Sequence, residues 1–333
     1  MPAVYGEPMQ GKPGSFHNRR RTGIGGSDAG AILGLSPWSS PLSVWEEKRG
    51  LGSELEASEP MIWGNRLEAA IAQGWSEDHG IKVTKGRFSR SKAHPFMVGH
   101  PDYEADDRII EVKMTHHLDD RWGPEGSDKV PAHYFAQVQH YMAVREADLA
   151  TLVVLEGGNR LREYTIPAVP VFQQAMIEEE AAFWELVKVG VPPAPDGSAA
   201  SAAALKVLYP VAKELTLEAP PEVEELLGQY VKAADATKRW EQEKSRLGQL
   251  VQGWMGEASK VTSPTYKASW PTRRGSISWK QAAEHIHGGW RDLMVPYLSD
   301  DALDEVQARI QERAEAEAKA EDGRGGFTVR EVK

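Results

Sequence analysis

The sequence predicts an α/β (α+β) core in which a central mixed sheet is flanked by helices, with a mainly helical extension after it. Three observations support this class. Helical patterns occupy the chain before Ile81, strand-like alternation follows as far as Met114, and a helix, a strand pair and another helix continue to Gly190. Of the 333 residues, 41% are hydrophobic and 26% are charged, which is typical of globular proteins and argues against a wholly disordered chain.

The amino-terminal part of the chain predicts a leader and three helices. Residues 1–20 mix glycine, proline and basic residues without periodicity, which indicates a flexible leader. In the first helix Ser27 is the expected N-cap, and Gly34 ends the helix. Proline near the start and glycine just past the end define two further helices, over residues 40–50 and 58–80.

The middle of the chain predicts the sheet and the helices that cover it. Three strand signals, at residues 81–89, 95–100 and 108–114, are compatible with an antiparallel meander. The elements that follow alternate helix and hairpin, namely a helix over 131–144, a hairpin over 147–166 that turns at 157–159, and a helix over 170–190.

A proline-rich stretch at residues 191–198 predicts the boundary of the core, which we expect over residues 21–190. Residues 199–333 differ in character. Glu222 to Met255 is a long, charge-rich amphipathic stretch that predicts a helical arm, and a small β-hairpin and a carboxy-terminal helix follow it. The sequence gives no role for this region.

Composition excludes several classes of protein. The chain has no cysteine, which rules out disulfides, thiolate zinc sites and cysteine nucleophiles and is consistent with a reducing compartment. No apolar run is long enough for a membrane span, and a cytoplasmic location is expected. The net charge of −10 means that any nucleic-acid binding must use a local basic lining.

The segment GHPDYEADDRIIEVK, residues 99–113, contains the most informative group of side chains. Asp102 follows a bend at a strand end, and Glu111 and Lys113 lie on a strand whose alternate residues are apolar. Alternation places Glu111 and Lys113 on one face, and pairing within the meander would bring Asp102 beside Glu111. The alternative interpretation is an edge strand that exposes Glu111 and Lys113 to water beside an ordinary turn.

Two carboxylates and an ammonium group at one sheet end point to metal-assisted chemistry. Carboxylate oxygens favour a hard cation such as Mg²⁺, with Mn²⁺ as a substitute, over zinc. Such a cation would polarise a phosphodiester and lower the pKa of a bound water molecule. Lys113 would orient that water or neutralise the developing charge.

The arrangement of Asp102, Glu111 and Lys113 resembles the PD-(D/E)xK nuclease superfamily, and three further motifs narrow the resemblance. TGIGGSDAGAILGLSPWSSPLSVWEEKRG, WGNRLE and YFAQVQHYM, in that order along the chain, are similar to the YqaJ-type, lambda-exonuclease-like branch that phages encode. The similarity extends over residues 20 to about 190, and a weaker likeness continues beyond. It implies a restriction-endonuclease-like core.

This resemblance assigns further residues to the metal site. Glu68 resembles the carboxylate that reaches the metal from a helix, so that with Asp102 and Glu111 it would complete a three-carboxylate cluster for one or two cations. Val112 would offer its backbone carbonyl as another ligand. Gln137 resembles the glutamine that contacts the active-site water or the scissile phosphate.

The resemblance also implies residues that contact DNA. Tyr134 shares a helix face with Gln137 and is assigned to DNA binding, with core packing as the alternative. An arginine and a serine near the glycine-rich segment bind the terminal 5′-phosphate in the family. Arg21 and Ser27 are assigned this task, and Arg20 is an equal candidate on spacing. The chemistry agrees, because a guanidinium, a hydroxyl and the amides at a helix start can all donate hydrogen bonds to an anion.

The expected function is therefore that of a Mg²⁺-dependent deoxyribonuclease, a phage-type 5′ to 3′ exonuclease that resects linear double-stranded DNA ends in a bacterial host cell. Two alternatives remain. One is a structure-selective or nicking endonuclease with the same metal site, and the other is a catalytically silent DNA-binding or assembly module on the nuclease fold. The family implies a partner that anneals single strands and, in some members, a ring-shaped homo-oligomer around DNA.

Overall fold

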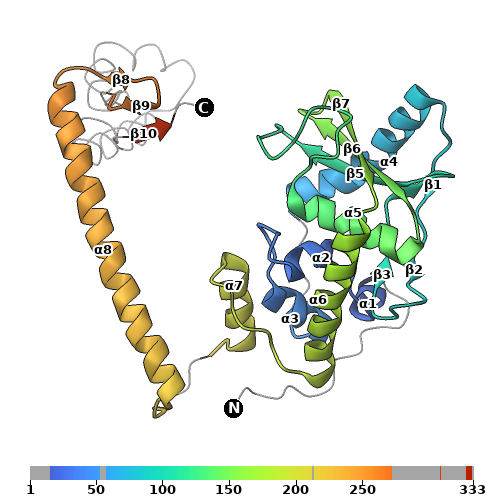
Figure 1. The fold of residues 1–333 in the computed structure, drawn as a ribbon, viewed down its shortest axis with the longest axis horizontal. Helices are drawn as coiled ribbons and strands as arrows, with labels where there is room; N and C mark the ends of the chain where they lie inside the picture. The colour runs from blue at the N-terminus through green and yellow to red at the C-terminus, as the bar shows by residue number, and fades with distance from the viewer. Residues whose placement is uncertain (1–15, 53–57, 212–213, 272–307, 309–327, 332–333) are drawn as a thin grey trace. The chain divides into compact units, whose positions relative to one another are not determined.

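The computed structural model describes residues 16–52, 58–211, 214–271, 308 and 328–331, and it divides into two compact units, Met1–Glu214 and Leu215–Lys333 (Figure 1). We describe each unit by itself. None of the helices in the described ranges is both long and apolar enough to cross a bilayer.

The first unit is built on a five-stranded sheet with the strand order β1-β4-β5-β6-β7. β5 and β6 pair in parallel, whereas the other neighbours are antiparallel, so the sheet is mixed. The strands are β1 (Thr84–Lys85), β4 (Tyr103–Glu104), β5 (Ile109–Thr115), β6 (Leu149–Glu156) and β7 (Arg160–Pro167). The predicted hairpin is confirmed, because β6 and β7 are joined by a turn in which Gly157 and Gly158 have positive φ.

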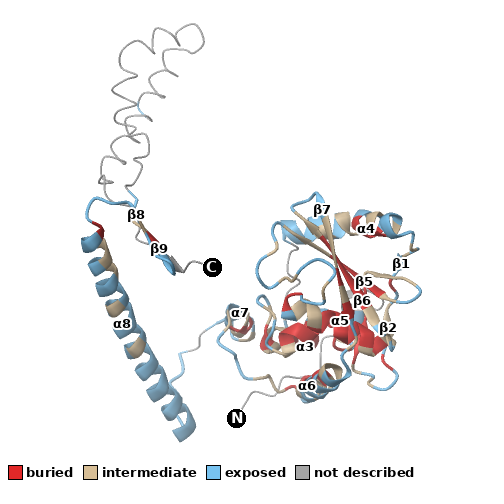
Figure 2. Ribbon diagram, turned by 45° about the horizontal axis from the view of Figure 1, so that its top comes forward, coloured by how far each residue is buried: buried red, intermediate tan, exposed pale blue. Residues whose placement is uncertain are grey.

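Helices cover both faces of this sheet, which confirms the predicted class (Figure 1). α4 (Glu59–His79) packs Ile71 and Trp75 against Ile110 and Val112 on one face. α5 (Ala132–Arg145) packs on the other face, where a separate cluster includes Ile109. Successive residues of β5 thus point to opposite layers, and buried residues gather in β5, β6 and α5 (Figure 2).

The predicted meander is only partly present. β4 and β5 pair across their turn as expected, but the segment predicted as a strand over 81–89 is broken into β1 and β2 (Ser89–Arg90), and β2 pairs with β3 (Val98–Gly99) in a separate two-stranded sheet. The break falls at Gly86, whose N–H donates to the Asp102 carbonyl at 3.0 Å. A Cβ there would lie 1.9 Å from the Pro101 carbonyl oxygen, so the chain crosses too closely for an ordinary strand residue.

The helices of the amino-terminal region differ from the prediction in two details. Residues Phe16–Arg21 form a short helix, α1, so the expected leader of residues 1–20 includes helical residues, and residues 1–15 lie outside the described ranges. Ser27 does not cap α2 (Gly26–Ile32). The N-cap is Gly25, two residues earlier, where the Asp28 carboxylate accepts a hydrogen bond from the Gly25 N–H at 2.7 Å.

Two other predicted helices are confirmed. Ser40 caps α3 (Pro41–Arg49) by accepting the Ser43 N–H, and Gly50 ends the helix in a left-handed conformation. α6 (Pro170–Val189) is likewise closed by Gly190.

The boundary predicted at residues 191–198 does not coincide with the end of the first unit, which continues to Glu214. α7 (Ala199–Leu208) begins at Ser198, which accepts the Ser201 N–H. The helix packs against α3, and its Ala204 is buried in the same cluster as Trp45 and Phe183. The proline-rich stretch is thus a connection inside the core, since α7 needs this surface to bury its apolar residues.

The second unit contains α8 (Pro221–Met255), which confirms the predicted arm, and a three-stranded sheet of order β10-β9-β8. β8 (Lys260–Thr262) and β9 (Tyr266–Ser269) form the predicted hairpin, and β10 (Thr328–Glu331), for which the sequence predicted no strand, pairs with β9. The predicted carboxy-terminal helix lies outside the described residues. α8 is exposed along most of its length (Figure 2).

Candidate active site

The candidate active site lies where β4 begins beside β5. Tyr103 pairs with Ile110, so the next positions outward are Asp102 and Glu111. The Val112 N–H donates to Asp102 Oδ2 at 2.9 Å. Because the N–H and C=O of one strand residue point to the same neighbour, the Val112 carbonyl is on the Asp102 side of β5. The structure therefore brings Asp102 to the strand that carries Glu111, as the sequence predicts.

Glu111 is the buried centre of this site, with 2% of its surface exposed. One carboxylate oxygen, Oε1, accepts hydrogen bonds from Lys113 Nζ and from Gln137 Nε2, each at 2.6 Å. The other oxygen, Oε2, is buried and has no hydrogen-bond partner. Alternation along β5 turns Glu111 and Lys113 toward the α5 layer, which is why Gln137 can reach Glu111.

The pKa of Asp102 is raised to about 7. Burial is the largest cause, and the negative charges of Glu111 and Glu68 add to it, whereas Lys113 and the hydrogen bond from Val112 act in the opposite direction. A carboxyl group with this pKa takes up a proton near neutral pH unless positive charge is brought to it. Asp102 and Glu111 thus form a site that attracts cations.

Glu68 does not join the other two carboxylates at ligand distance. On α4 it is near enough to Asp102 to affect its pKa, but its carboxylate is ion-paired with Lys85. In the part of the chain that the structure describes, no three His, Asp or Glu side chains are close enough to hold a metal ion. The three carboxylates would repel one another, and the ion pair with Lys85 compensates the charge of Glu68 near Asp102 and Glu111. The predicted cluster is therefore a pair of carboxylates with a third held nearby.

The donor set fits a hard divalent cation. The unpartnered Glu111 Oε2 is a buried charged oxygen, and leaving such a group without a partner is costly. A cation between Asp102 and Glu111 would satisfy this oxygen and lower the pKa of Asp102. The donors are all oxygens, which Mg²⁺ and Mn²⁺ prefer, and the Val112 carbonyl adds a third. Glu68 could contribute after exchanging Lys85 for the cation.

Lys113 faces the carboxylates. Besides its ion pair with Glu111, its ammonium lies 5.3 Å from the centre of the Tyr134 ring. Burial alone would lower the pKa of Lys113, but the charges of Glu111 and Asp102 outweigh burial and raise it. Lys113 is therefore cationic at neutral pH and can stabilise an anion at this site.

The predicted face of α5 is present. Gln137 donates to Tyr141 Oη at 3.2 Å as well as to Glu111, and Tyr134 lies above Lys113 on the same side of the helix. Tyr141 is 7% exposed and packs in the core, whereas Tyr134, for which core packing was the alternative, is only partly buried.

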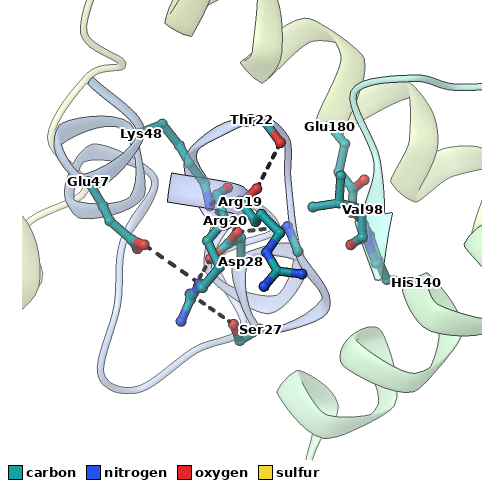
Figure 3. A network of polar contacts seen from close by, with 11 residues as sticks. Arg19, Arg20, Thr22, Ser27, Asp28, Glu47, Lys48, Val98, His140 and Glu180 are labelled. Atoms are coloured by element: carbon teal, nitrogen blue, oxygen red, sulfur yellow. Dashed lines mark hydrogen bonds and ion pairs between the residues drawn. The ribbon is translucent and has the colours of Figure 1, made fainter. Parts of the chain in front are cut away.

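A second polar cluster surrounds the start of α2 (Figure 3). The Arg20 guanidinium lies 3.3 Å from Ser27 Oγ and 3.2 Å from Asp28 Oδ1. Of the two arginines considered from the sequence, Arg20 is thus the one that contacts Ser27. Its position at the amino end of α2 places a guanidinium, a hydroxyl and helix amides together, as anion binding requires.

Asp28 and Lys48 also belong to this cluster, and sequence patterns alone do not indicate it. The Lys48 side chain is completely buried, and Nζ lies 2.5 Å from Asp28 Oδ2 and 3.0 Å from the Arg20 carbonyl oxygen (Figure 3). Burial alone would raise the pKa of Asp28, but the charges of Lys48 and Arg20 outweigh burial and lower it. In the sequence, Lys48 sits in a run of charges that is typical of a solvent-exposed helix face.

The two clusters are joined through α2 and α5. Gly26 packs so closely on α5 that a Cβ there would lie 2.5 Å from Tyr141 Cε1 and 3.0 Å from the Gln137 carbonyl oxygen. Tyr141 in turn binds Gln137, which binds Glu111. A glycine is required at this position because only a residue without a side chain permits the contact.

The fold and the site define a mixed α/β domain with an acidic, lysine-containing centre, and comparison with known proteins gives its family. Residues 15–148 match the YqaJ-like viral recombinase domain. This segment contains Asp102, Glu111, Lys113 and Gln137 and the cluster at α2. Over this segment the resemblance to the YqaJ family that the motifs predict is therefore confirmed.

The chain is 29% identical over 260 residues to the uncharacterized protein YqaJ of Bacillus subtilis (strain 168). The aligned region covers 75% of this chain and 81% of YqaJ, so it extends beyond the matched domain.

Two solved structures are similar to the chain at low sequence identity. The alkaline exonuclease LHK-Exo from Laribacter hongkongensis is 15% identical, with a TM-score of 0.41, over 51% of this chain and 89% of that one. A phage-related exonuclease from Haemophilus somnus 129PT is 14% identical, with a TM-score of 0.40, over 52% and 96% of the two chains.

Proposed function

We propose that the protein is a Mg²⁺-dependent deoxyribonuclease that resects linear double-stranded DNA from its 5′ ends. The observation that carries the proposal is the buried pair of Asp102 and Glu111 beside Lys113 in a YqaJ-like viral recombinase domain. Phosphodiester hydrolysis needs a divalent cation and a positive group near the scissile phosphate, and this site offers ligands for the first and supplies the second.

In this proposal Asp102, Glu111 and the Val112 carbonyl hold Mg²⁺, for which Mn²⁺ substitutes, and Glu68 joins them in binding one or two ions. When bound, the cation supplies polarisation of the phosphodiester and a more acidic water molecule. Lys113 stabilises the negative charge that develops on the phosphate. Gln137 holds Glu111 by donating to Oε1, which leaves Oε2 for the cation.

We assign recognition of the 5′ end to Arg20 and Ser27, with Arg21 as the neighbouring alternative. The support is the contact between Arg20 and Ser27 and the closeness of α2 to the helix that carries Gln137. Tyr134, beside Lys113, would contact the DNA strand at the scissile bond. A terminal phosphate at Ser27 would then place the bond near Glu111.

The same proposal sets the biological context. A YqaJ-like viral recombinase domain that resects ends fits phage recombination by single-strand annealing in the cytoplasm of a bacterial host. The resemblance drawn from the sequence adds a partner that anneals the exposed strand and a ring-shaped homo-oligomer around DNA.

The direct test is digestion of an end-labelled linear duplex in Mg²⁺, with and without a 5′-phosphate. We expect nucleotides to be released from the 5′-phosphorylated strand in Mg²⁺ or Mn²⁺ and no release in excess chelator. A blocked 5′ end should stall the reaction.

Covalently closed circular DNA is the control substrate. If the protein cuts circular DNA, the assigned activity changes from exonuclease to endonuclease with the same metal site. Binding of DNA without any digestion in Mg²⁺ or Mn²⁺ would instead indicate a catalytically silent module.

Replacement of Arg20 by alanine should remove most of the preference for a 5′-phosphate. The guanidinium makes charge-assisted hydrogen bonds, so its loss should reduce the rate on phosphorylated ends by about tenfold to a hundredfold, with little change on hydroxyl ends. The measurement is the ratio of the two rates. Arg21→Ala is the matched control, and if it abolishes the preference while Arg20→Ala does not, the assignment passes to Arg21.

A further inference from the structure

Trp38 is an exposed tryptophan held in a defined turn. It lies between α2 and α3 with 66% of its surface exposed. The turn is fixed by Ser36, whose Oγ accepts the N–H groups of Trp38 and Ser39 at 3.3 and 3.1 Å. Exposing an indole ring on an ordered turn leaves a large apolar face open to a ligand.

The indole belongs to a row of aromatic rings that leads to the candidate active site. The Trp38 ring meets the His133 ring edge to face, with centres 5.0 Å apart and an angle of 89° between planes. The His133 ring is 4.0 Å from the Tyr134 ring, which is 5.3 Å from Lys113 Nζ. The contacts from Trp38 through His133 and Tyr134 to Lys113 are thus continuous.

His133 forms the middle of this row as a neutral ring. Burial, together with the positive charges of Arg121 and Lys113, lowers the pKa of His133 to about 4. Helix α2 fixes the residue from behind, because a Cβ at Gly30 would lie 3.1 Å from His133 Cβ. The edge of the imidazole therefore supports Trp38, while the positive charge comes from Lys113 and Arg121.

We propose that the Trp38 indole face is a stacking subsite for a nucleobase of the DNA strand whose backbone lies at Lys113. The inference rests on the proposed nuclease function. Binding of unpaired strands combines cations along the backbone with aromatic faces for the bases, and the row from Trp38 to Lys113 has both. The exposed face suits any base, so the subsite would hold the strand without selecting sequence.

The test uses duplexes in which a single abasic site is moved nucleotide by nucleotide away from the 5′ end. At the position that stacks on Trp38, wild-type protein should lose about tenfold in single-turnover digestion relative to the intact strand. Trp38→Ala should lose about tenfold on intact DNA and show no further loss at that abasic position. Trp38→Phe should retain most of the rate and the abasic effect.

The matched control is Trp240→Ala, which removes an equally exposed tryptophan, 73% exposed, from α8 in the other unit. It should leave the abasic effect unchanged, and thermal unfolding should show that Trp38→Ala is folded. Equal abasic losses in wild type and Trp38→Ala would overturn the inference, as would the absence of any abasic effect.

Binding of single-stranded oligonucleotides, measured by fluorescence anisotropy, separates this inference from the proposed function. Affinity that falls when one base is missing in wild type but not in Trp38→Ala supports the subsite even if no DNA is digested. Affinity that is the same for both proteins and for abasic strands overturns it, whatever the outcome of digestion.

Discussion

Replacing Lys113 by alanine is expected to abolish Mg²⁺-dependent digestion while DNA binding is largely retained. Lys113 is the cation that faces Glu111 and Asp102, and removal of one preorganised charge at a reacting phosphate costs at least about a hundredfold in rate. Single-turnover digestion of a labelled duplex gives the rate, and a gel-shift measurement gives the affinity. Lys92→Ala, at an exposed position, is the control for loss of a positive charge.

Lys113→Ala also removes the positive charge that compensates the buried Glu111 carboxylate, which could destabilise the protein. A second variant therefore separates an effect on catalysis from an effect on folding. Glu111→Gln keeps the size of the side chain and removes a negative charge that repels Asp102, so the protein should fold and still fail to digest DNA. Undiminished digestion by either variant would refute the assignment of this site.

Replacing Lys48 by methionine is expected to lower the free energy of unfolding by about 3–5 kcal/mol. The change removes the buried cation 2.5 Å from Asp28 and leaves only the partly exposed Arg20 to compensate the buried carboxylate, so much of the cost of breaking a buried ion pair is expected. Urea unfolding measures the effect. The double variant with Asp28→Asn should recover much of the loss, whereas Lys92→Met at the surface should have little effect.

The same pair predicts how this loss depends on pH. In the wild type the pKa of Asp28 is lowered, so its contribution to stability is present above the ordinary pKa of aspartate and lost as the pH falls through the folded-state pKa. Without Lys48, the largest influence that opposes burial is gone, so the pKa of Asp28 lies higher than in the wild type and protonation of Asp28 reduces the loss as the pH falls. The difference between the two proteins should therefore shrink in acid. A loss below about 1 kcal/mol at neutral pH, or one that grows in acid, would contradict this account.

The centre of the site was predictable because it depends on local periodicity. Alternation along β5 fixes the side on which Glu111 and Lys113 lie, and the short turn before β5 fixes Asp102 beside them. Helical spacing placed Gln137 on one face with Tyr134, whereas its task at the site came from the resemblance to the family. In each case the neighbouring residues in the sequence determine where the side chain points.

The remaining features depend on contacts between segments that are distant in the sequence. Nothing near Glu68 indicates that Lys85 binds its carboxylate, and nothing near Lys48 indicates that Asp28 draws it into the interior. The same holds for α7, whose proline-rich approach is typical of a linker although the helix packs on α3. Periodicity reports which face of an element is apolar, but not which partner covers that face.

The contact at Gly26 determines what the two clusters can do together. Since α2 rests on Tyr141 and Gln137 without an intervening side chain, the cluster proposed to bind a DNA terminus and the cluster proposed to cleave the strand pack directly against each other. In the proposed function this contact sets the distance between the bound terminus and the scissile bond. The length of the released product would then not depend on the sequence of the strand.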